Sequence, residues 1–139
     1  MGARSFLDTS VLVYTDDDSN PGKKARALEL YRECREQRSG VVSLQVLQEY
    51  FVTTTGKLGV AAIQARRKTA LFARLDLVIP AIDDVLAAID LHRLHTLSFW
   101  DALIVQAALI SRCAVLYSED MQDGWLVDGL RIVNPFSES

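Results

Sequence analysis

The chain is poor in cysteine, proline and glycine, and it has no long apolar segment. Of its 139 residues, two are cysteine, three are proline and seven are glycine. Cys34 and Cys113 lie far apart, without the short spacing of metal-binding or redox motifs, so we expect two reduced thiols packed in helices. No run approaches the roughly 18 apolar residues of a membrane span, and the first residues contain no long apolar leader. These absences favour a cytoplasmic protein with no membrane association.

Charge is divided unevenly along the chain, although the net charge is only −3. Residues 1–74 carry 12 lysines and arginines against 8 acids, whereas residues 75–139 carry 3 against 10. A basic half beside an acidic half fits a polyanion held near a metal-loaded acidic site. Ordinary solvated helix faces explain the same charges, and charge alone slightly favours that simpler interpretation.

Short apolar segments alternate with longer amphipathic segments, a pattern that predicts strands alternating with helices. This alternation is typical of an α/β protein, a three-layer α/β/α sandwich around a mostly parallel sheet of about five strands. We see no repeat or linker and expect a single domain over residues 1–139. Strands are predicted at 4–7, 41–43, 77–79, 114–117 and 130–133, and helices at 23–38, 44–55, 61–75, 83–95 and 99–112.

Acidic residues stand where predicted strands end or helices begin. In parallel sheets, sites form beyond the carboxyl ends of the strands, so these acids are expected to meet in one crevice. Carboxylates without Cys or His at ligand spacing suit a hard cation, Mg²⁺ or Mn²⁺, and hence metal-dependent phosphoryl chemistry. Taken singly, each acid is also explained as a helix cap, a solvated helix position or a surface loop. The residues are Asp8, Glu49, Asp101, Asp120 and Asp123, with Ser10 and Ser118 as nearby hydroxyls.

Four segments carry a family resemblance: FLDTSVLVY, LQVLQEYFV, SFWDALIVQAA and LYSEDMQDG. In this order they resemble the acidic motifs of the PIN domain, and most closely the VapC-type toxin ribonucleases of toxin–antitoxin modules. The resemblance spans essentially the whole chain. It implies a PIN-like sandwich, an Mg²⁺ or Mn²⁺ site and cleavage of RNA. The motif acids fall on Asp8, Glu49, Asp101 and Asp120, with Asp123 as an accessory acid and Ser10 and Ser118 at hydroxyl positions.

The resemblance also implies partners: an RNA substrate, a cognate antitoxin protein and a second toxin subunit in a homodimer. Tyr50, Phe51 and Leu58 are candidates for an apolar groove that takes an antitoxin helix. His92 and His95, three residues apart on one helix, are compatible with a metal-binding pair, but we expect a partly buried structural pair. Trp100 is expected to be a core residue and Glu119 a solvent-facing acid. Candidates for phosphate contacts are Lys23, Lys24 and Arg26, and Arg66, Arg67 and Lys68.

Two other functions remain open from the sequence. A phospho-acceptor signalling domain also uses a parallel sheet, Mg²⁺ and acids at strand ends, but it needs an acceptor Asp after the third strand, where this chain has Pro80. A non-catalytic interaction module with the PIN fold is the second alternative, and the nearly complete acidic set counts against it.

Overall fold

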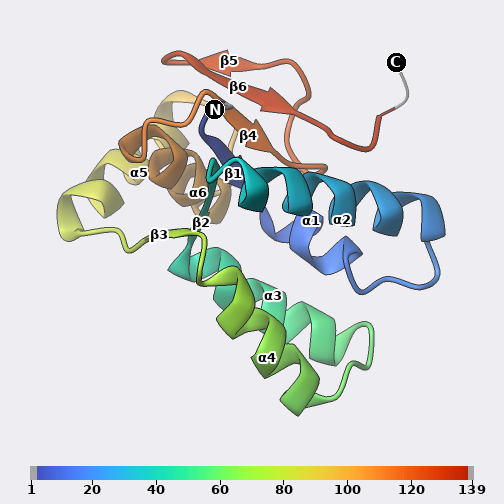
Figure 1. The fold of residues 1–139 in the computed structure, drawn as a ribbon. Coiled ribbons are helices and arrows are strands. Elements are labelled where there is room, and N and C mark those ends of the chain that lie inside the picture. The colour runs from blue at the N-terminus through green and yellow to red at the C-terminus, as the bar shows by residue number, and fades with distance from the viewer. Residues whose placement is uncertain (1–2, 138–139) are drawn as a thin grey trace.

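The computed structural model describes residues 3–137, in which six strands form one sheet in the order β3-β2-β1-β4-β6-β5. Every neighbouring pair is parallel except β5 and β6. The mostly parallel sheet confirms the predicted fold class (Figure 1). The strands are β1 (Ser5–Leu7), β2 (Gly40–Ser43), β3 (Asp76–Val78), β4 (Val115–Tyr117), β5 (Leu126–Val127) and β6 (Leu130–Val133).

The sixth strand was not expected. β5 has only two residues and forms a hairpin with β6 through Asp128 and Gly129, which both have positive φ angles, 49° and 85°. An Asp-Gly pair between apolar residues is a known signal for a two-residue hairpin. The Asp-Gly pair in the sequence therefore indicated a hairpin, but the two apolar residues of β5 were too few to be predicted as a strand.

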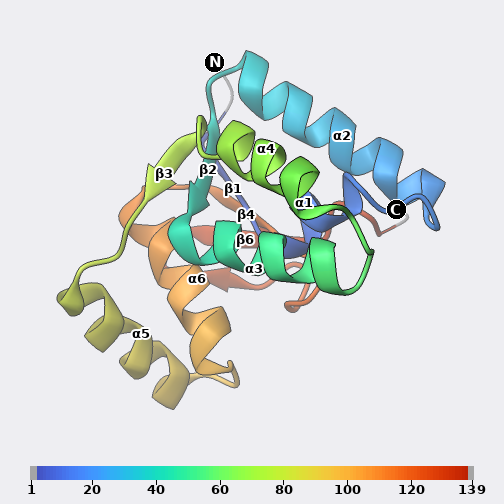
Figure 2. The same cartoon turned by 90° about the horizontal axis from the view of Figure 1, so that it is seen from below.

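Helices cover both faces of the sheet, which gives the three predicted layers. Figure 2 shows α2 on one side of the strands and α5 with α6 on the other, while α3 and α4 pack side by side. One short helix, α1, was not predicted, because its six residues are too few to show helical periodicity. The helices are α1 (Thr9–Tyr14), α2 (Pro21–Glu36), α3 (Leu44–Gly56), α4 (Ala62–Phe72), α5 (Ile82–Leu94) and α6 (Phe99–Ile110).

The sheet reverses its strand order at β1. From β1 the chain builds β2 and then β3 on one side, and it later returns to place β4 and β6 on the other side. Residue Ser5 in β1 pairs with Gly40 in β2 and with Val115 in β4. Parallel sheets open a crevice beyond the carboxyl ends of the strands at such a reversal, so the residues following β1 and β4 border it.

Both cysteines are buried free thiols, as expected, although only Cys34 lies in a helix and Cys113 follows α6. No helix within residues 3–137 has the length and apolar composition needed to cross a lipid bilayer.

An aromatic cluster fixes α4 against the rest of the core. Phe72, at the end of α4, is 1% exposed and packs edge-on against Tyr31 of α2 and Tyr50 of α3, with ring centroids 5.2 and 5.1 Å apart. Tyr50 is fully buried, so the prediction that it lines an exposed groove was wrong. Its hydroxyl donates to Asp16 Oδ2 at 2.5 Å, which supplies the polar partner that a buried tyrosine needs.

We expect Phe72→Ala to lower the free energy of unfolding by about 3–5 kcal/mol, because it leaves a cavity between two aromatic rings. Ile63→Ala in the same helix is the control, since Ile63 is 57% exposed and its loss should change stability by about 0.5 kcal/mol or less. Urea unfolding measures both. Equal effects of the two substitutions would contradict the proposed packing.

Candidate metal centre

Asp8 is an acid buried at the end of the central strand. It follows β1, is 3% exposed and caps α1, with the backbone N–H of Thr9 donating to its Oδ1 at 2.7 Å. The hydroxyl of Ser118, which follows β4, donates to Asp8 Oδ2 at 2.6 Å. One side chain therefore caps α1 and joins the ends of β1 and β4, and the two hydrogen bonds fix the direction in which its carboxylate points.

Burial raises the pKa of Asp8 from about 3.8 to about 7. Loss of hydration is the largest cause, and the negative charges of Asp120 and Asp101 raise it further. The hydrogen bonds from Ser118 and Thr9 act in the opposite direction but do not cancel the effect. The ionised form of Asp8 is thus destabilised by its surroundings.

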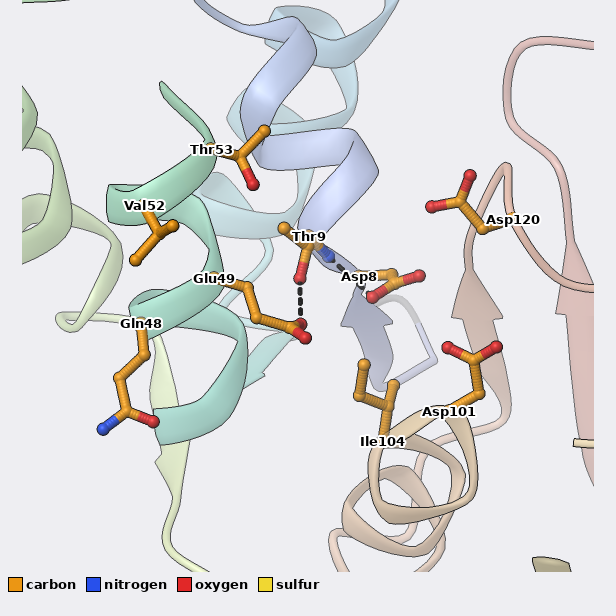
Figure 3. Close-up of a pocket in the computed structure, with 9 residues that line it drawn as sticks. All are labelled: Asp8, Thr9, Gln48, Glu49, Val52, Thr53, Asp101, Ile104 and Asp120. Atoms are coloured by element: carbon orange, nitrogen blue, oxygen red, sulfur yellow. Dashed lines mark hydrogen bonds between the residues drawn. The ribbon is translucent and has the colours of Figure 1, made fainter. Parts of the chain in front are cut away.

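Four of the five predicted acids line one open cavity of about 400 Å³ at this edge of the sheet. Asp8 comes from the end of β1, Glu49 from α3, Asp101 from α6 and Asp120 from the loop after β4 (Figure 3). Within residues 3–137, however, no three carboxylate, histidine or cysteine side chains are arranged to hold a single ion. The structure thus gathers the acids around a shared space without closing them into a complete ligand shell.

Asp101 and Asp120 face Asp8 across the cavity. Ser98 caps α6 by accepting from the backbone N–H of Asp101 at 3.1 Å, which places Asp101 in the first turn. Burial is the largest cause of the raised pKa of both acids. The charges of Asp120 and Glu49 raise the pKa of Asp101 further, whereas a hydrogen bond between the Ser98 side chain and the Asp101 carboxylate lowers it. The charge of Glu119 raises the pKa of Asp120 further, and the charge of Lys57 lowers it. These shifts show that the carboxylates interact electrostatically.

Glu49 enters the cavity through a contact that the sequence did not reveal. The hydroxyl of Thr9 donates to Glu49 Oε1 at 2.7 Å, and Gln45 Nε2 lies 3.4 Å from Oε2. Thr9 directly follows Asp8, so α1 connects the two acids. The D-T pair in the first motif marked Thr9, but only the fold shows that it orients a glutamate 40 residues away.

The remaining predicted residues lie at the edge of the cavity or outside it. Ser118 is fully buried and also accepts from the backbone N–H of Asp120 at 3.1 Å, so it supports the loop as well as Asp8. Ser10 accepts from the backbone N–H of Glu119 at 3.2 Å. Asp123 is exposed, accepts from the backbone N–H of Asn134 at 2.8 Å and does not line the cavity. Its ligand role stays a prediction.

Glu119 does not simply face solvent, contrary to our expectation. It accepts from the hydroxyl of Tyr14 at 2.6 Å and from Lys23 Nζ at 2.7 Å. Burial acts to raise its pKa, but these two hydrogen bonds and the charge of Lys23 hold the pKa below its usual value. Because Glu119 directly precedes Asp120, this contact ties the acidic loop to α1 and α2.

Most of the predicted phosphate-binding cations are already paired with carboxylates. Lys23 pairs with Glu119, Lys24 with Asp18, Arg26 with Glu29 and Lys68 with Asp16, at 2.5 to 3.0 Å. Arg66 and Arg67 are exposed on α4. A cation that we did not select, Lys57 at the end of α3, instead lines a cleft together with Asp120.

The predictions for Trp100 and for the pair His92 and His95 were wrong. Trp100 is 61% exposed and is therefore not a core residue. His92 and His95 are both exposed and make separate contacts: His92 Nδ1 lies 2.6 Å from the carbonyl of Leu97, and His95 packs edge-on against Trp125. The two histidines do not act as one pair.

We expect Asp8→Asn to stabilise the metal-free protein at pH 8, by up to about 4 kcal/mol, because the substitution removes a buried charge. The folded-state pKa of Asp8, about 7, lies above its value of 3.8 in a free chain. Its stabilising contribution is therefore complete below about pH 4 and is lost as the pH rises towards 7. The gain from Asp8→Asn should consequently shrink below pH 7.

Thermal unfolding with EDTA from pH 4 to 8 measures this difference. Asp90→Asn is the control, because Asp90 is an exposed acid on α5. A gain that is the same at every pH would show that the charge of Asp8 is not its cause.

Comparisons with known proteins agree with this architecture. The model of the PIN domain family matches residues 5–122, whereas a search of curated proteins returned no match. One similar solved structure is VapC20 of Mycobacterium tuberculosis, described as a sarcin–ricin-loop-cleaving toxin, with a TM-score of 0.64 at 17% identity over 84% of this chain and 89% of that chain. Another is a toxin–antitoxin complex from Klebsiella pneumoniae, with a TM-score of 0.68 at 20% identity over 96% and 99%. At such identities the solved structures show a shared fold, and the family match shows that the chain belongs to the PIN domain family.

Proposed function

We propose that this protein is a metal-dependent endoribonuclease that acts as the toxin of a toxin–antitoxin pair. The observation that carries the proposal is the buried Asp8, whose pKa is raised to about 7 and which faces Asp101 and Asp120 across one cavity. Acids with perturbed pKa values that gather in one cleft are typical of functional sites. The family membership and the printed descriptions of the two solved structures support the reaction and its biological role.

The donor set fits a hard divalent cation. The four acids that line the cavity supply carboxylate oxygens, which suit Mg²⁺ or Mn²⁺. Asp8, Asp101 and Asp120 would hold the ion, and Glu49 would hold a second ion or orient water, with Asp123 as an accessory acid. A bound cation supplies charge stabilisation at the phosphate that is cleaved.

The chain's own residues organise this site. Ser118 orients Asp8 and supports the backbone at Asp120, while Thr9 holds Glu49 towards the cavity. With these positions fixed before substrate arrives, little reorganisation is needed during the reaction. Ser10 holds the backbone of Glu119 and thereby the loop that carries Asp120.

An apolar groove supports the proposed antitoxin partner. It lies beside the acidic cavity and is lined by Leu44, Leu47, Gln48, Phe51, Val52 and Thr69, with Gln48 and Val52 lining both. An amphipathic helix is a suitable occupant of a groove of this kind. A segment seated there would lie against the entrance of the acidic cavity and hinder RNA. Of the residues first predicted for the groove, only Phe51 lines it.

We also propose a homodimer, as the family resemblance implies. Ile82, Leu86 and Ile89 are 69%, 52% and 39% exposed and recur at helical spacing on α5. A second copy covering this row would remove apolar surface from water.

Light scattering should then give twice the monomer mass for the unmodified protein. Leu86→Glu should give the monomer mass, because it places a charge in the apolar row.

The phospho-acceptor alternative has little support. β3 ends at Val78 and is followed by Ile79 and Pro80, so no acceptor acid stands at its carboxyl end. The non-catalytic interaction module is distinguished from the nuclease by the cleavage experiment.

We expect the purified protein to cleave a total-RNA pool into discrete fragments with Mg²⁺ or Mn²⁺ and to leave it intact with EDTA. Asp8→Asn and Asp101→Asn should each lower the cleavage rate at least about 100-fold, because they remove charge from the site. The control is Asp128→Asn, which changes an exposed acid in the turn between β5 and β6. Circular dichroism checks that each variant folds.

Undiminished cleavage by both site variants would point to a contaminating nuclease and contradict the assignment. Absence of cleavage under every condition, with all variants folded, would favour the interaction module.

A further inference from the structure

A second cleft adjoins the acidic cavity and, unlike that cavity, is lined by a cation, Lys57. Its volume is about 490 Å³, and it shares Thr9, Thr53 and Asp120 with the cavity. The two spaces thus meet around Thr9 of α1, Thr53 of α3 and the loop that carries Asp120. A chain-like ligand lying in one space can therefore continue into the other.

Lys57 lines this cleft and forms no salt bridge within residues 3–137, although its charge lowers the pKa of Asp17 and of Asp120. The salt bridges among residues 3–137 engage Lys23, Lys24 and Lys68, but none of them includes Lys57. Lys57 caps the end of α3 and its residue is exposed. Its ammonium group remains available for an anion that enters the cleft.

Two of the three acids that line the cleft, in contrast, already have side-chain partners. Asp17 accepts hydrogen bonds from the side chains of Ser19 and Asn20 at 2.5 and 2.9 Å. Glu119 accepts hydrogen bonds from Lys23 and Tyr14, and Asp120 also lines the acidic cavity. Glu119 is neutralised by its ion pair with Lys23. Asp17 keeps its negative charge, because its hydrogen bonds and the charge of Lys57 lower its pKa. An anion entering the cleft would bind at Lys57, the cation that lines it.

We infer that this cleft binds the RNA nucleotide adjacent to the scissile phosphate, and that Lys57 contacts the phosphate of that nucleotide. The inference rests on the proposed nuclease function and adds the path of the substrate and one of its binding residues. Lys57 is a substrate-binding residue in this proposal and takes no part in holding the metal ion.

The size and lining of the cleft fit a nucleotide. Its volume lies within the roughly 300–1,000 Å³ of small-molecule pockets. Val13 and Leu58 provide apolar surface for a base, and the hydroxyls of Ser10 and Ser19 provide polar contacts for a sugar. A lysine ammonium is a compact point charge that contacts phosphate without demanding a fixed geometry. None of these groups reads a base edge in a predictable way, so the contact should be independent of sequence.

The location of Lys57 supports an anionic ligand over a purely structural role. A cation beside an acidic cavity weakens the attraction of that cavity for Mg²⁺. This disadvantage is offset when a phosphate lies between the two positive charges, because it interacts favourably with both. A lysine that served only to neutralise Asp120 would be expected to form a direct ion pair, as Lys23 does with Glu119.

The test measures RNA binding separately from cleavage. Lys57→Ala, Lys57→Arg and the control Arg32→Ala are each combined with Asp101→Asn, which blocks cleavage. Arg32 is an exposed residue in the C-terminal half of α2, and it does not line the cleft. Binding of a short fluorescent single-stranded RNA of mixed sequence is measured with Mg²⁺ over a range of KCl concentrations.

Lys57→Ala should weaken binding about tenfold, the effect of losing one charged hydrogen bond. The slope of log affinity against log salt should fall by about 0.7, the value for one phosphate contact on a single strand. Lys57→Arg should keep most of the affinity, and Arg32→Ala should change it less than twofold. In the cleavage-competent protein, Lys57→Ala should raise KM for RNA and leave kcat within about twofold.

Unchanged affinity and salt slope in Lys57→Ala would overturn the subsite, even if the protein cleaves RNA as proposed. Equal losses in Lys57→Ala and Arg32→Ala would also overturn it, because they would indicate a general effect of net charge. If the unmodified protein neither binds nor cleaves RNA, the proposed function itself fails and the subsite fails with it.

Discussion

The site depends on the parallel pairing of β1 with β4. Leu7 pairs with Tyr117, and the backbone N–H of Asp8 donates to the carbonyl of Tyr117 at 3.0 Å, so the two strands end at the same level. This register brings the hydroxyl of Ser118 to Asp8 across 110 residues of sequence. A shift of one residue would turn these side chains to the opposite faces of the sheet. The apolar core that fixes the register therefore also fixes the acidic site.

Burial of Asp8 opposes stability near neutral pH but serves the metal site that we propose. The surroundings that exclude water also raise the pKa of Asp8 and make its charge unfavourable near neutral pH. Asp101 and Asp120 add to the repulsion across the cavity. A bound cation would convert these same carboxylates from a source of repulsion into a set of ligands.

Sequence patterns predicted the features that repeat along the chain and missed those that depend on single contacts. The alternation of apolar strands and amphipathic helices was sufficient for the fold class and for the edge at which Asp8, Glu49, Asp101 and Asp120 meet. β5 and α1 were missed because they are too short to display a period. Tyr50 was predicted to be exposed and is buried, and Trp100 was predicted to be buried and is exposed. The residue type alone does not indicate which face of an amphipathic helix an aromatic side chain occupies.

The positive charges show why local sequence is a poor guide to substrate binding. Basic clusters such as Lys23-Lys24 looked suited to phosphate, but the fold gives each of these lysines a carboxylate partner. The Lys23–Glu119 pair instead holds the loop that carries Asp120, so a cation predicted to contact substrate indirectly supports the acidic cavity. Lys57 has no basic neighbour in the sequence and was not predicted to contact substrate, yet it lines a cleft together with Asp120. Whether a cation is available to a substrate is decided by its neighbours in space, which belong to other helices and loops.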